Sequence, residues 1–285
     1  MSKLAIHGGN PVRKDFLVFG QPVLGDEEIN EVVDTLKSKW IGTGPKTVRF
    51  EQDFAAYIGC SDALAVNSCT AALHLALLAC GIKAGDEVLV TAMTFAASAN
   101  VIVHCGARPV FVDIDPLTLN FDLENLQKKI TSKTKAIMAV HFAGLPLDLI
   151  RLSEIARRHG LAIVEDAAHA VGASINVKKI GSWGNLTAFS FYANKNITTG
   201  EGGMLTAVDL DGKTRDYLIE MRLHGLTRDA WKRFHRKELI HSYVVEAGYK
   251  YNMTDIHAAR GIHQLAGVEA TWRRREQIWL RYSGA

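Results

Sequence analysis

One lysine, Lys195, lies in a segment whose residue types suit covalent chemistry. It follows the apolar run 186–191, and residues 196–203 are rich in Thr and Gly, as a tight turn near a phosphate would be. A lysine in a polar loop is ordinarily a solvated surface charge. In an apolar pocket or beside another cation, however, its amine loses the proton more readily and can attack a carbonyl to form a Schiff base. The context of Lys195 favours this second interpretation.

Asp166 follows a second apolar run, residues 161–165. An aspartate at the end of a strand is often only a cap or turn residue. Pyridoxal 5′-phosphate, however, needs a carboxylate that keeps its ring nitrogen protonated, and an aspartate on a rigid strand supplies that charge in a fixed geometry. The adjacent Glu165 should point to the opposite face of the strand, so a two-carboxylate acid–base site is not expected.

Phosphate would be bound by the turn at 67–74, where a strand is expected to pass into a helix. Backbone N–H groups at a helix start, with the helix dipole behind them, form an anion site. Thr70 would add a hydroxyl, and Ser190 could add another. The alternative is simple capping of the helix by Ser68 or Thr70, which is compatible with phosphate binding.

Two ring side chains complete the candidate site. Phe95 follows the strand expected at 87–91 and could lie flat against a cofactor ring, although an isolated aromatic is more often part of the core. His169 could bond a ring hydroxyl, and its alternative role is that of a satisfied core histidine.

The elements that must position these residues alternate along the chain as short apolar runs and helical patterns, which is the signature of βαβ units. Helices are expected at 70–80 and 147–159, and the run 88–105 is interpreted as a buried strand and a helix rather than a membrane span. Ligands bind such sheets beyond the carboxyl ends of the strands, where the candidate residues lie. The predicted strands are 63–66, 87–91, 109–113, 136–140, 161–165, 186–191 and 203–208.

The composition is that of an ordinary globular chain of 285 residues, 48% hydrophobic and 22% charged, with a net charge of +3. So small an excess of positive charge predicts neither a nucleic-acid partner nor a membrane surface. No signal peptide opens the chain, and a cytoplasmic location is predicted. Neither a metal site nor a disulfide framework is expected, because the cysteines lack CxxC spacing and ligand-spaced histidines. The cysteines are Cys60, Cys69, Cys80 and Cys105.

Together these residues resemble the DegT/StrS sugar aminotransferases, members of the fold-type-I pyridoxal-phosphate superfamily. The resemblance runs along nearly the whole chain and includes EDAAHA at 165–170 and GYKYNMTDI at 248–256. It implies an α/β fold in which helices flank a mostly parallel central sheet. The segments that carry it are 22–28, 40–45, 67–73, 85–88, 94–95, 165–170, 190–203 and 248–256.

The resemblance also implies a role for each candidate residue. Lys195 corresponds to the lysine that binds the cofactor and later shuttles a proton, and Asp166 to the partner of the ring nitrogen. His169 stands where members carry Gln or His beside the ring oxygen, and Phe95 where an aromatic side chain covers the ring. The implied phosphate contacts are Thr70, Ala71 and Ser190.

Two positions depart from the family's pattern. In many members an Asn in a Gly-Tyr-Asn pattern reaches the phosphate from the neighbouring subunit of a homodimer. Here Lys250 occupies that place and Asn252 stands two residues on, so either could make the contact. Cys69 replaces a frequent Gly, which would slightly crowd the turn.

The implied activity is transfer of an amino group, most simply from L-glutamate, to a ketone on a nucleotide-linked sugar, in amino-sugar synthesis for surface polysaccharides or secondary metabolites. Two other functions remain open: a sugar dehydratase or lyase that uses the same cofactor, whose members typically carry His at the lysine position, and a non-catalytic truncated family member. A basic stretch could meet the diphosphate of the sugar nucleotide, with a solvated loop as an equal alternative. It comprises Arg228, Lys232, Arg233, Arg236 and Lys237.

The expected domain organisation is a large cofactor-binding domain at 1–247 and the start of a small C-terminal domain at 248–285. Because family members usually extend further, the resemblance predicts a truncated chain. A helix is expected at 268–282, and its aromatic side chains Trp272, Trp279 and Tyr282 would ordinarily pack on the part that follows.

Overall fold

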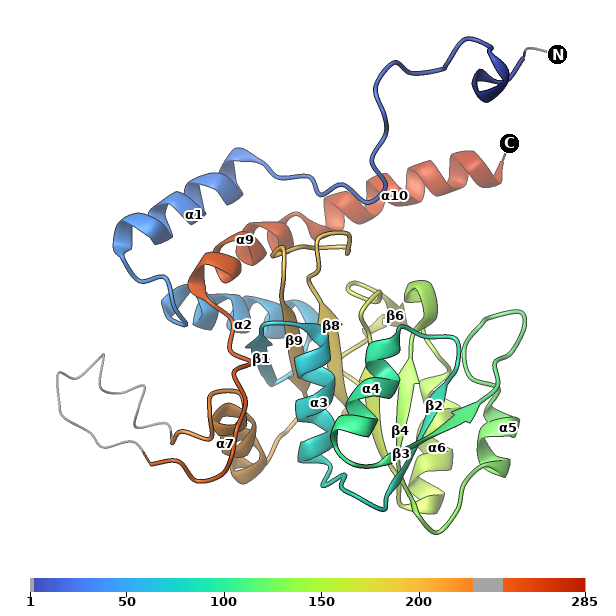
Figure 1. Ribbon diagram of the computed structural model, residues 1–285, viewed down its shortest axis with the longest axis vertical. Coiled ribbons are helices and arrows are strands. Elements are labelled where there is room, and N and C mark those ends of the chain that lie inside the picture. Colours follow the sequence, from blue (N-terminus) through green and yellow to red (C-terminus); the bar gives the residue numbers. More distant parts are fainter. Residues whose placement is uncertain (1–2, 228–242, 285) are drawn as a thin grey trace.

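The computed structural model describes residues 3–227 and 243–284. Its centre is a seven-stranded sheet in the order β1-β9-β8-β5-β4-β2-β3 (Figure 1). The strands from β8 to β3 are mutually parallel, and β9 is antiparallel to both neighbours. The predicted α/β fold with a mostly parallel sheet is therefore confirmed. The strands are β1 Asp62–Val66, β2 Glu87–Thr91, β3 Arg108–Val112, β4 Thr134–Val140, β5 Ala162–Asp166, β8 Leu186–Ser190 and β9 Gly203–Ala207, with a separate hairpin of β6 Ser174–Ile175 and β7 Lys178–Lys179.

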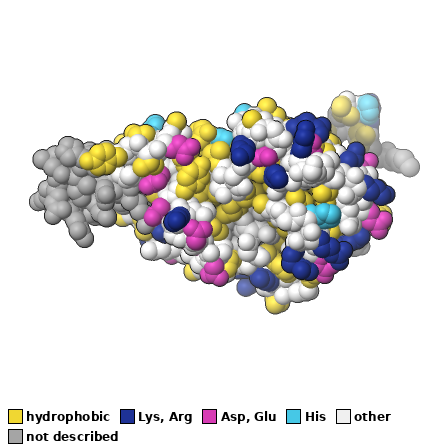
Figure 2. Space-filling view, turned by 90° about the horizontal axis from the view of Figure 1, so that it is seen from below, with side chains coloured by type: hydrophobic (Ala, Val, Ile, Leu, Met, Phe, Trp, Pro, Cys, Tyr) yellow, Lys and Arg dark blue, Asp and Glu magenta, His cyan; other side chains and the backbone are white. Residues whose placement is uncertain are grey.

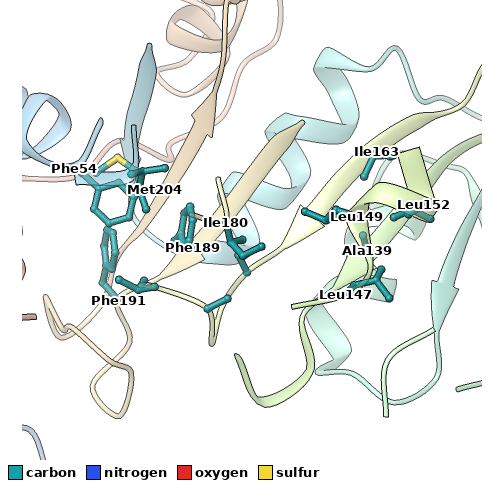
Figure 3. Packing of buried hydrophobic residues seen from close by; sticks show 14 of the residues in the cluster. Phe54, Ala139, Leu147, Leu149, Leu152, Ile163, Ile180, Phe189, Phe191 and Met204 are labelled. Carbon is teal, nitrogen blue, oxygen red and sulfur yellow. The ribbon is translucent and has the colours of Figure 1, made fainter. Parts of the chain in front are cut away.

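Helices cover both faces of the sheet. On one face α3, α4 and α7 pack over a core that includes Leu75 and Leu205. On the other face α2, α5, α6 and α9 pack over a second core, in which the rings of Phe54 and Phe191 meet edge to face at 5.4 Å (Figure 3). The helices are α1 Asp26–Ser38, α2 Pro45–Ile58, α3 Cys69–Ala79, α4 Ala96–His104, α5 Leu123–Lys128, α6 Leu149–His159, α7 Gly212–Met221, α9 Asp255–Ala266 and α10 Val268–Ser283, with short 3₁₀ turns at Ala5–His7 and Phe142–Gly144.

Side-chain caps fix where the predicted helices begin. The helix expected at 147–159 starts at Leu149, because the Asp148 carboxylate accepts the N–H of Arg151 at 3.0 Å and so occupies the N-cap. α3 begins one residue before the expected 70–80, because Ser68 is its N-cap. The apolar run 88–105 divides into β2 and α4 as predicted.

The segment after residue 247 is joined to the body of the protein. Met253 and Ile262 belong to the core under α9. The buried carboxylate of Asp255 accepts the N–H groups of Lys46 and Thr47, both at 3.0 Å, and thereby ties the start of α9 to the start of α2. The division into domains at 1–247 and 248–285 stays a prediction.

The far half of α10 and the N-terminal arm both project from the body (Figure 1). On α10, Trp272, Trp279 and Tyr282 are exposed. On the face seen in Figure 2, basic and acidic side chains are interspersed with hydrophobic ones. Within residues 3–227 and 243–284, no helix is both long and apolar enough to cross a membrane.

Gly203 brings β9 into contact with the first turn of α3. A Cβ at this position would lie 2.5 Å from the carbonyl carbon of Ser68 and 2.6 Å from the backbone nitrogen of Cys69. We expect Gly203→Ala to lower the free energy of unfolding by about 1–3 kcal/mol, since the backbone of the turn has to move. Urea denaturation measures the change.

The matched control for this substitution is Gly212→Ala in the first turn of α7, where no atom lies within 4 Å of the added Cβ. Its stability should be unchanged or higher by up to about 1 kcal/mol, because alanine favours helix. Equal stabilities of the Gly203→Ala and Gly212→Ala proteins would contradict the prediction.

Candidate active site

A cavity of about 620 Å³ lies beyond the carboxyl ends of β2, β4, β5 and β8. This is the edge of the sheet at which the sequence predicted a site. Ala71, Lys250 and Asn252 were predicted for the site but do not line this cavity. The predicted site residues that do line it are Thr70, Phe95, Asp166, His169, Ser190 and Lys195.

Asp166 is the last residue of β5, and only 5% of its surface is exposed. Its Oδ2 accepts a hydrogen bond from the hydroxyl of Ser98 at 2.6 Å, and its Oδ1 accepts one from the N–H of Ala168 at 3.1 Å. Ser98 belongs to α4 and is completely buried. The carboxylate is therefore held from two directions, by a helix and by its own chain.

Glu165 points away from the cavity, as the alternation of a strand requires. Its Oε2 lies 2.8 Å from Nε2 of His141, and its Oε1 accepts a hydrogen bond from the Asn185 amide at 2.7 Å. Because Nδ1 of His141 accepts the N–H of Leu147 at 3.1 Å, the imidazole proton lies on Nε2 and is donated to Glu165. Asp166 is thus the carboxylate of this strand that faces the cavity.

Lys195 and His169 meet inside the cavity, with 2.8 Å between Nζ and Nε2. The pKa of His169 is lowered, first by burial and then by the positive charge of Lys195, while the charge of Asp166 acts in the opposite direction. The ammonium group therefore donates to a neutral imidazole. The backbone N–H of Lys195 donates to the carbonyl of Tyr192 at 3.0 Å, which shapes the turn that carries the lysine.

The first turn of α3 forms another wall of the cavity. The hydroxyl of Ser68 accepts the N–H of Ala71 at 3.1 Å, so the capping interpretation holds for Ser68. The Thr70 side chain and the buried Ser190, at the end of β8, both line the cavity near this turn. Burial first, and then the charge of Asp166, raise the pKa of the Cys69 thiol well above its usual value, against the opposing charge of Lys195.

Phe95 is the N-cap residue of α4, and 80% of its surface is exposed at the rim of the cavity. The packing explanation for this aromatic is therefore wrong, because it belongs to neither core cluster. An exposed ring beside a cavity is available to cover a flat ligand.

Lys250 and Asn252 have different surroundings. Asn252 is half-buried and donates from its amide to the hydroxyl of Thr43 at 2.6 Å, and it lines another cavity, of about 410 Å³, between α2, β1 and α7. The Lys250 side chain is exposed, and among the described residues its ammonium has no hydrogen bond or ion pair. The Lys250 backbone is held in place, since its carbonyl accepts the Asn67 amide at 3.0 Å.

Ser98, His141 and Glu165 had no assigned contacts in the sequence interpretation. A signal for Ser98 exists, because it shares the buried side of α4 with Val101 and Ile102, where a hydroxyl needs a partner. The basic stretch Arg228, Lys232, Arg233, Arg236 and Lys237 lies outside the described residues. In the part of the chain that the structure describes, no group of His, Cys, Asp or Glu could hold a metal ion.

Comparison with known proteins identifies similar sequences. The sequence profile of the DegT/DnrJ/EryC1/StrS aminotransferase family matches residues 22–285. The protein MJ1066 of Methanocaldococcus jannaschii, which is uncharacterised, is 53% identical over 272 residues, covering 95% of this chain and 70% of that protein. The spore coat polysaccharide biosynthesis protein SpsC of Bacillus subtilis is 48% identical, covering 96% of this chain and 70% of SpsC.

Solved structures with a similar fold are also aminotransferases. Spr1654 of Streptococcus pneumoniae, assigned as a sugar aminotransferase, superposes in its PMP form with a TM-score of 0.89 and 38% identity, covering 94% of this chain and 72% of that one. Its PLP form superposes with a TM-score of 0.87. PseC of Helicobacter pylori, an aminotransferase involved in the biosynthesis of pseudoaminic acid, has a TM-score of 0.85 and 29% identity, covering 93% of this chain and 69% of PseC.

The contact between Lys195 and His169 predicts opposite effects of two substitutions on the pKa of His169 in the cofactor-free protein. Lys195→Ala should raise it, because a neighbouring positive charge is removed, and Asp166→Asn should lower it further, because a negative charge is removed. An NMR titration of the imidazole measures both. Lys83→Ala, which removes an exposed charge near the amino end of β2, should leave this pKa unchanged, and shifts in the same direction for the two cavity variants would contradict the prediction.

Proposed function

The chain belongs to the DegT/DnrJ/EryC1/StrS aminotransferase family, whose cofactor is pyridoxal 5′-phosphate, and we propose that it transfers an amino group from L-glutamate to a ketone on a nucleotide-linked sugar. The family resemblance found in the sequence is thereby confirmed. The observation that carries the proposal is the meeting of a buried carboxylate, Asp166, and an amine, Lys195, at one cavity beyond the strand ends.

The residues present fit this cofactor. The cavity, of about 620 Å³, offers a fixed acid for a ring nitrogen, an amine for an aldehyde and a helix start for a phosphate. When bound, the cofactor carries the amino group between the two substrates and delocalises the electrons released at the substrate carbon.

We assign Lys195 and Asp166 the catalytic roles. The Lys195 amine would hold the cofactor aldehyde. Once released, it would move a proton from the substrate carbon to the cofactor in the first half-reaction and from the cofactor to the sugar carbon in the second. Asp166 would hold a proton on the ring nitrogen, since its carboxylate is fixed by two donors at the cavity wall. The imidazole of His169, whose pKa is lowered, would lie beside the ring oxygen as a neutral group and would add no positive charge there.

Binding of the cofactor would use the remaining wall residues. Phe95 would swing its exposed ring across one face of the cofactor. The hydroxyls of Thr70 and Ser190 and the backbone at Ala71 would contact the phosphate at the start of α3. The N–H of Ala71 is bonded to Ser68 at 3.1 Å, so it would share its hydrogen bond or exchange it when the phosphate arrives.

We further propose a homodimer in which Lys250, rather than Asn252, contacts the phosphate in the neighbouring subunit. The amide nitrogen of Asn252 donates to Thr43 within its own chain and its Oδ1 is buried, whereas the exposed ammonium of Lys250 extends from a backbone that is held in place. An ammonium brings a positive charge to its hydrogen bond with phosphate, whereas an amide is a neutral donor. A cytoplasmic location stays a prediction. The lyase alternative has no feature of the site in its favour, because lysine stands at position 195.

The substrate proposal is tested by incubating the PLP-loaded protein with L-glutamate and, separately, with UDP-, dTDP- and GDP-linked keto-sugars. Mass spectrometry should show replacement of one ketone oxygen by an amino group and release of 2-oxoglutarate. Amination of free keto-sugars at an equal rate would exclude a role for the nucleotide, and use of another amino donor in place of glutamate would exclude the donor assignment.

Lys195→Ala should lower the rate of amination at least about 100-fold, because both the covalent anchor and the proton shuttle are lost. In addition, borohydride should fix the cofactor to the wild-type chain and not to the variant, which intact-mass measurement detects. Lys83→Ala, an exposed lysine far from the cavity, is the control and should behave as the wild type. Wild-type turnover by Lys195→Ala would show that another group serves these roles.

Lys250→Ala should weaken cofactor binding about tenfold, since one charge-assisted hydrogen bond to phosphate is lost, while Asn252→Ala should leave it unchanged. Equilibrium dialysis measures the affinity. Mixed dimers of Lys195→Ala and Lys250→Ala subunits then show whether Lys250 contacts the phosphate of its own subunit or that of the neighbouring subunit. If Lys250 acts across the interface, each mixed dimer regains one wild-type site. If no site recovers, or if sedimentation shows a cofactor-saturated monomer, the proposal fails.

A further inference from the structure

We propose that Ser98 is a positioning residue for the reaction: its hydroxyl orients the Asp166 carboxylate so that one oxygen lone pair faces the ring nitrogen of the cofactor. The inference rests on the proposed function of Asp166. Three observations lead to it: the geometry of the hydroxyl, the complete burial of Ser98, and its place on a helix that is separate in sequence from β5.

The direction of the hydrogen bond follows from the neighbours of Ser98. Its Oγ lies 2.6 Å from Oδ2 of Asp166, 2.7 Å from the hydroxyl of Thr94 and 3.2 Å from the carbonyl of Phe95. A hydroxyl has one proton, and the ionised carboxylate is both the nearest of these groups and the strongest acceptor. Ser98 therefore donates to Asp166 and can accept from Thr94.

The two donors restrain the carboxylate in different ways. The N–H of Ala168 bonds Oδ1 from two residues along the same chain, so it follows any movement of that chain. Ser98 bonds Oδ2 from α4, on the helical layer that covers this face of the sheet. With one donor on each oxygen, rotation of the carboxylate plane breaks at least one hydrogen bond, and the plane is fixed relative to the cavity.

The cost of losing the Ser98 hydroxyl is raised by burial. Ser98 has no exposed surface and Asp166 has 5%, so water has little access to replace the missing donor. The carboxylate would turn toward the cavity to recover solvation, and its contact with a ring nitrogen would lose the correct angle. Loss of a hydroxyl elsewhere in the core would not change the contact between Asp166 and the ring nitrogen specifically.

The experiment compares binding of two cofactors in the Lys195→Ala background, where binding is reversible. One is pyridoxal 5′-phosphate, and the other is its 1-deaza analogue, in which a C–H replaces the ring nitrogen and nothing can be held by Asp166. Ser98→Ala should weaken binding of pyridoxal 5′-phosphate about tenfold, the effect of one hydrogen bond to a charged group. It should leave binding of the analogue unchanged.

A mutant cycle gives a second, independent readout. In an Asp166→Asn background the effect of Ser98→Ala on pyridoxal 5′-phosphate binding should disappear, because there is no longer a carboxylate to orient. Ser153→Ala, at an exposed position of α6, is the matched control and should not alter either affinity. If Ser98→Ala does not fold, Ser98→Cys keeps most of the volume but supplies a weaker donor, and the same loss in smaller measure is expected.

An equal loss of affinity for both cofactors would show that Ser98 supports the cavity in general and would overturn the proposal. So would an unchanged affinity for pyridoxal 5′-phosphate, or a loss that persists in the Asp166→Asn background. These results do not depend on turnover. The amination assay reports separately on the proposed function, so the failure of one inference is distinguishable from the failure of the other.

Discussion

The arrangement of this protein depends on keeping one carboxylate, Asp166, ionised and immobile at the inner wall of a cavity. A charge with 5% exposure is costly unless its oxygens are hydrogen-bonded, and here the donors come from α4 and from the chain itself. β5 lies inside the sheet between β4 and β8, which fixes the height of the carboxylate relative to the turn that carries Lys195. The sheet thus serves as the rigid frame that both charged groups require.

Much of this frame is predictable from the chain alone. Continuous apolar runs such as 136–140 and 186–191 identify strands buried on both faces, and the observed bounds differ from the predicted ones by at most two residues. At a helix start the difference arises from capping, as at Asp148, where one hydrogen bond decides which residue begins α6. The hydrophobic pattern does not show which residue begins this helix, because Leu147 and Leu149 are equally apolar.

The site is predictable where chain order determines it. Residues that follow parallel strands must meet at one sheet edge, so the pairing of Asp166 and Lys195 can be predicted from the sequence. The contacts that helices make with those residues cannot be predicted in this way. Ser98 lies 68 residues from Asp166, and the bond between them depends on how α4 rests on the sheet. The surroundings of Lys250 and Asn252 could not be predicted either, because both side chains can donate to a phosphate and the sequence does not show that Asn252 bonds Thr43 while Lys250 is exposed.

The two acids at the end of β5 also restrict the register of this strand. Glu165 and Asp166 lie on opposite faces of the strand: Glu165 bonds His141 and Asn185, and Asp166 bonds Ser98. A slip of this strand by a single position would turn each acid to the other face. In one direction Glu165, one methylene longer, would take the place of Asp166 at the cavity, and in the other Asp166, one methylene shorter, would take the place of Glu165 beside His141. The side-chain hydrogen bonds of Glu165 and Asp166 therefore favour one register of β5 over its neighbours. We expect the double substitution Glu165→Asp and Asp166→Glu to lower both the stability of the protein and its affinity for the cofactor, although net charge and composition stay the same.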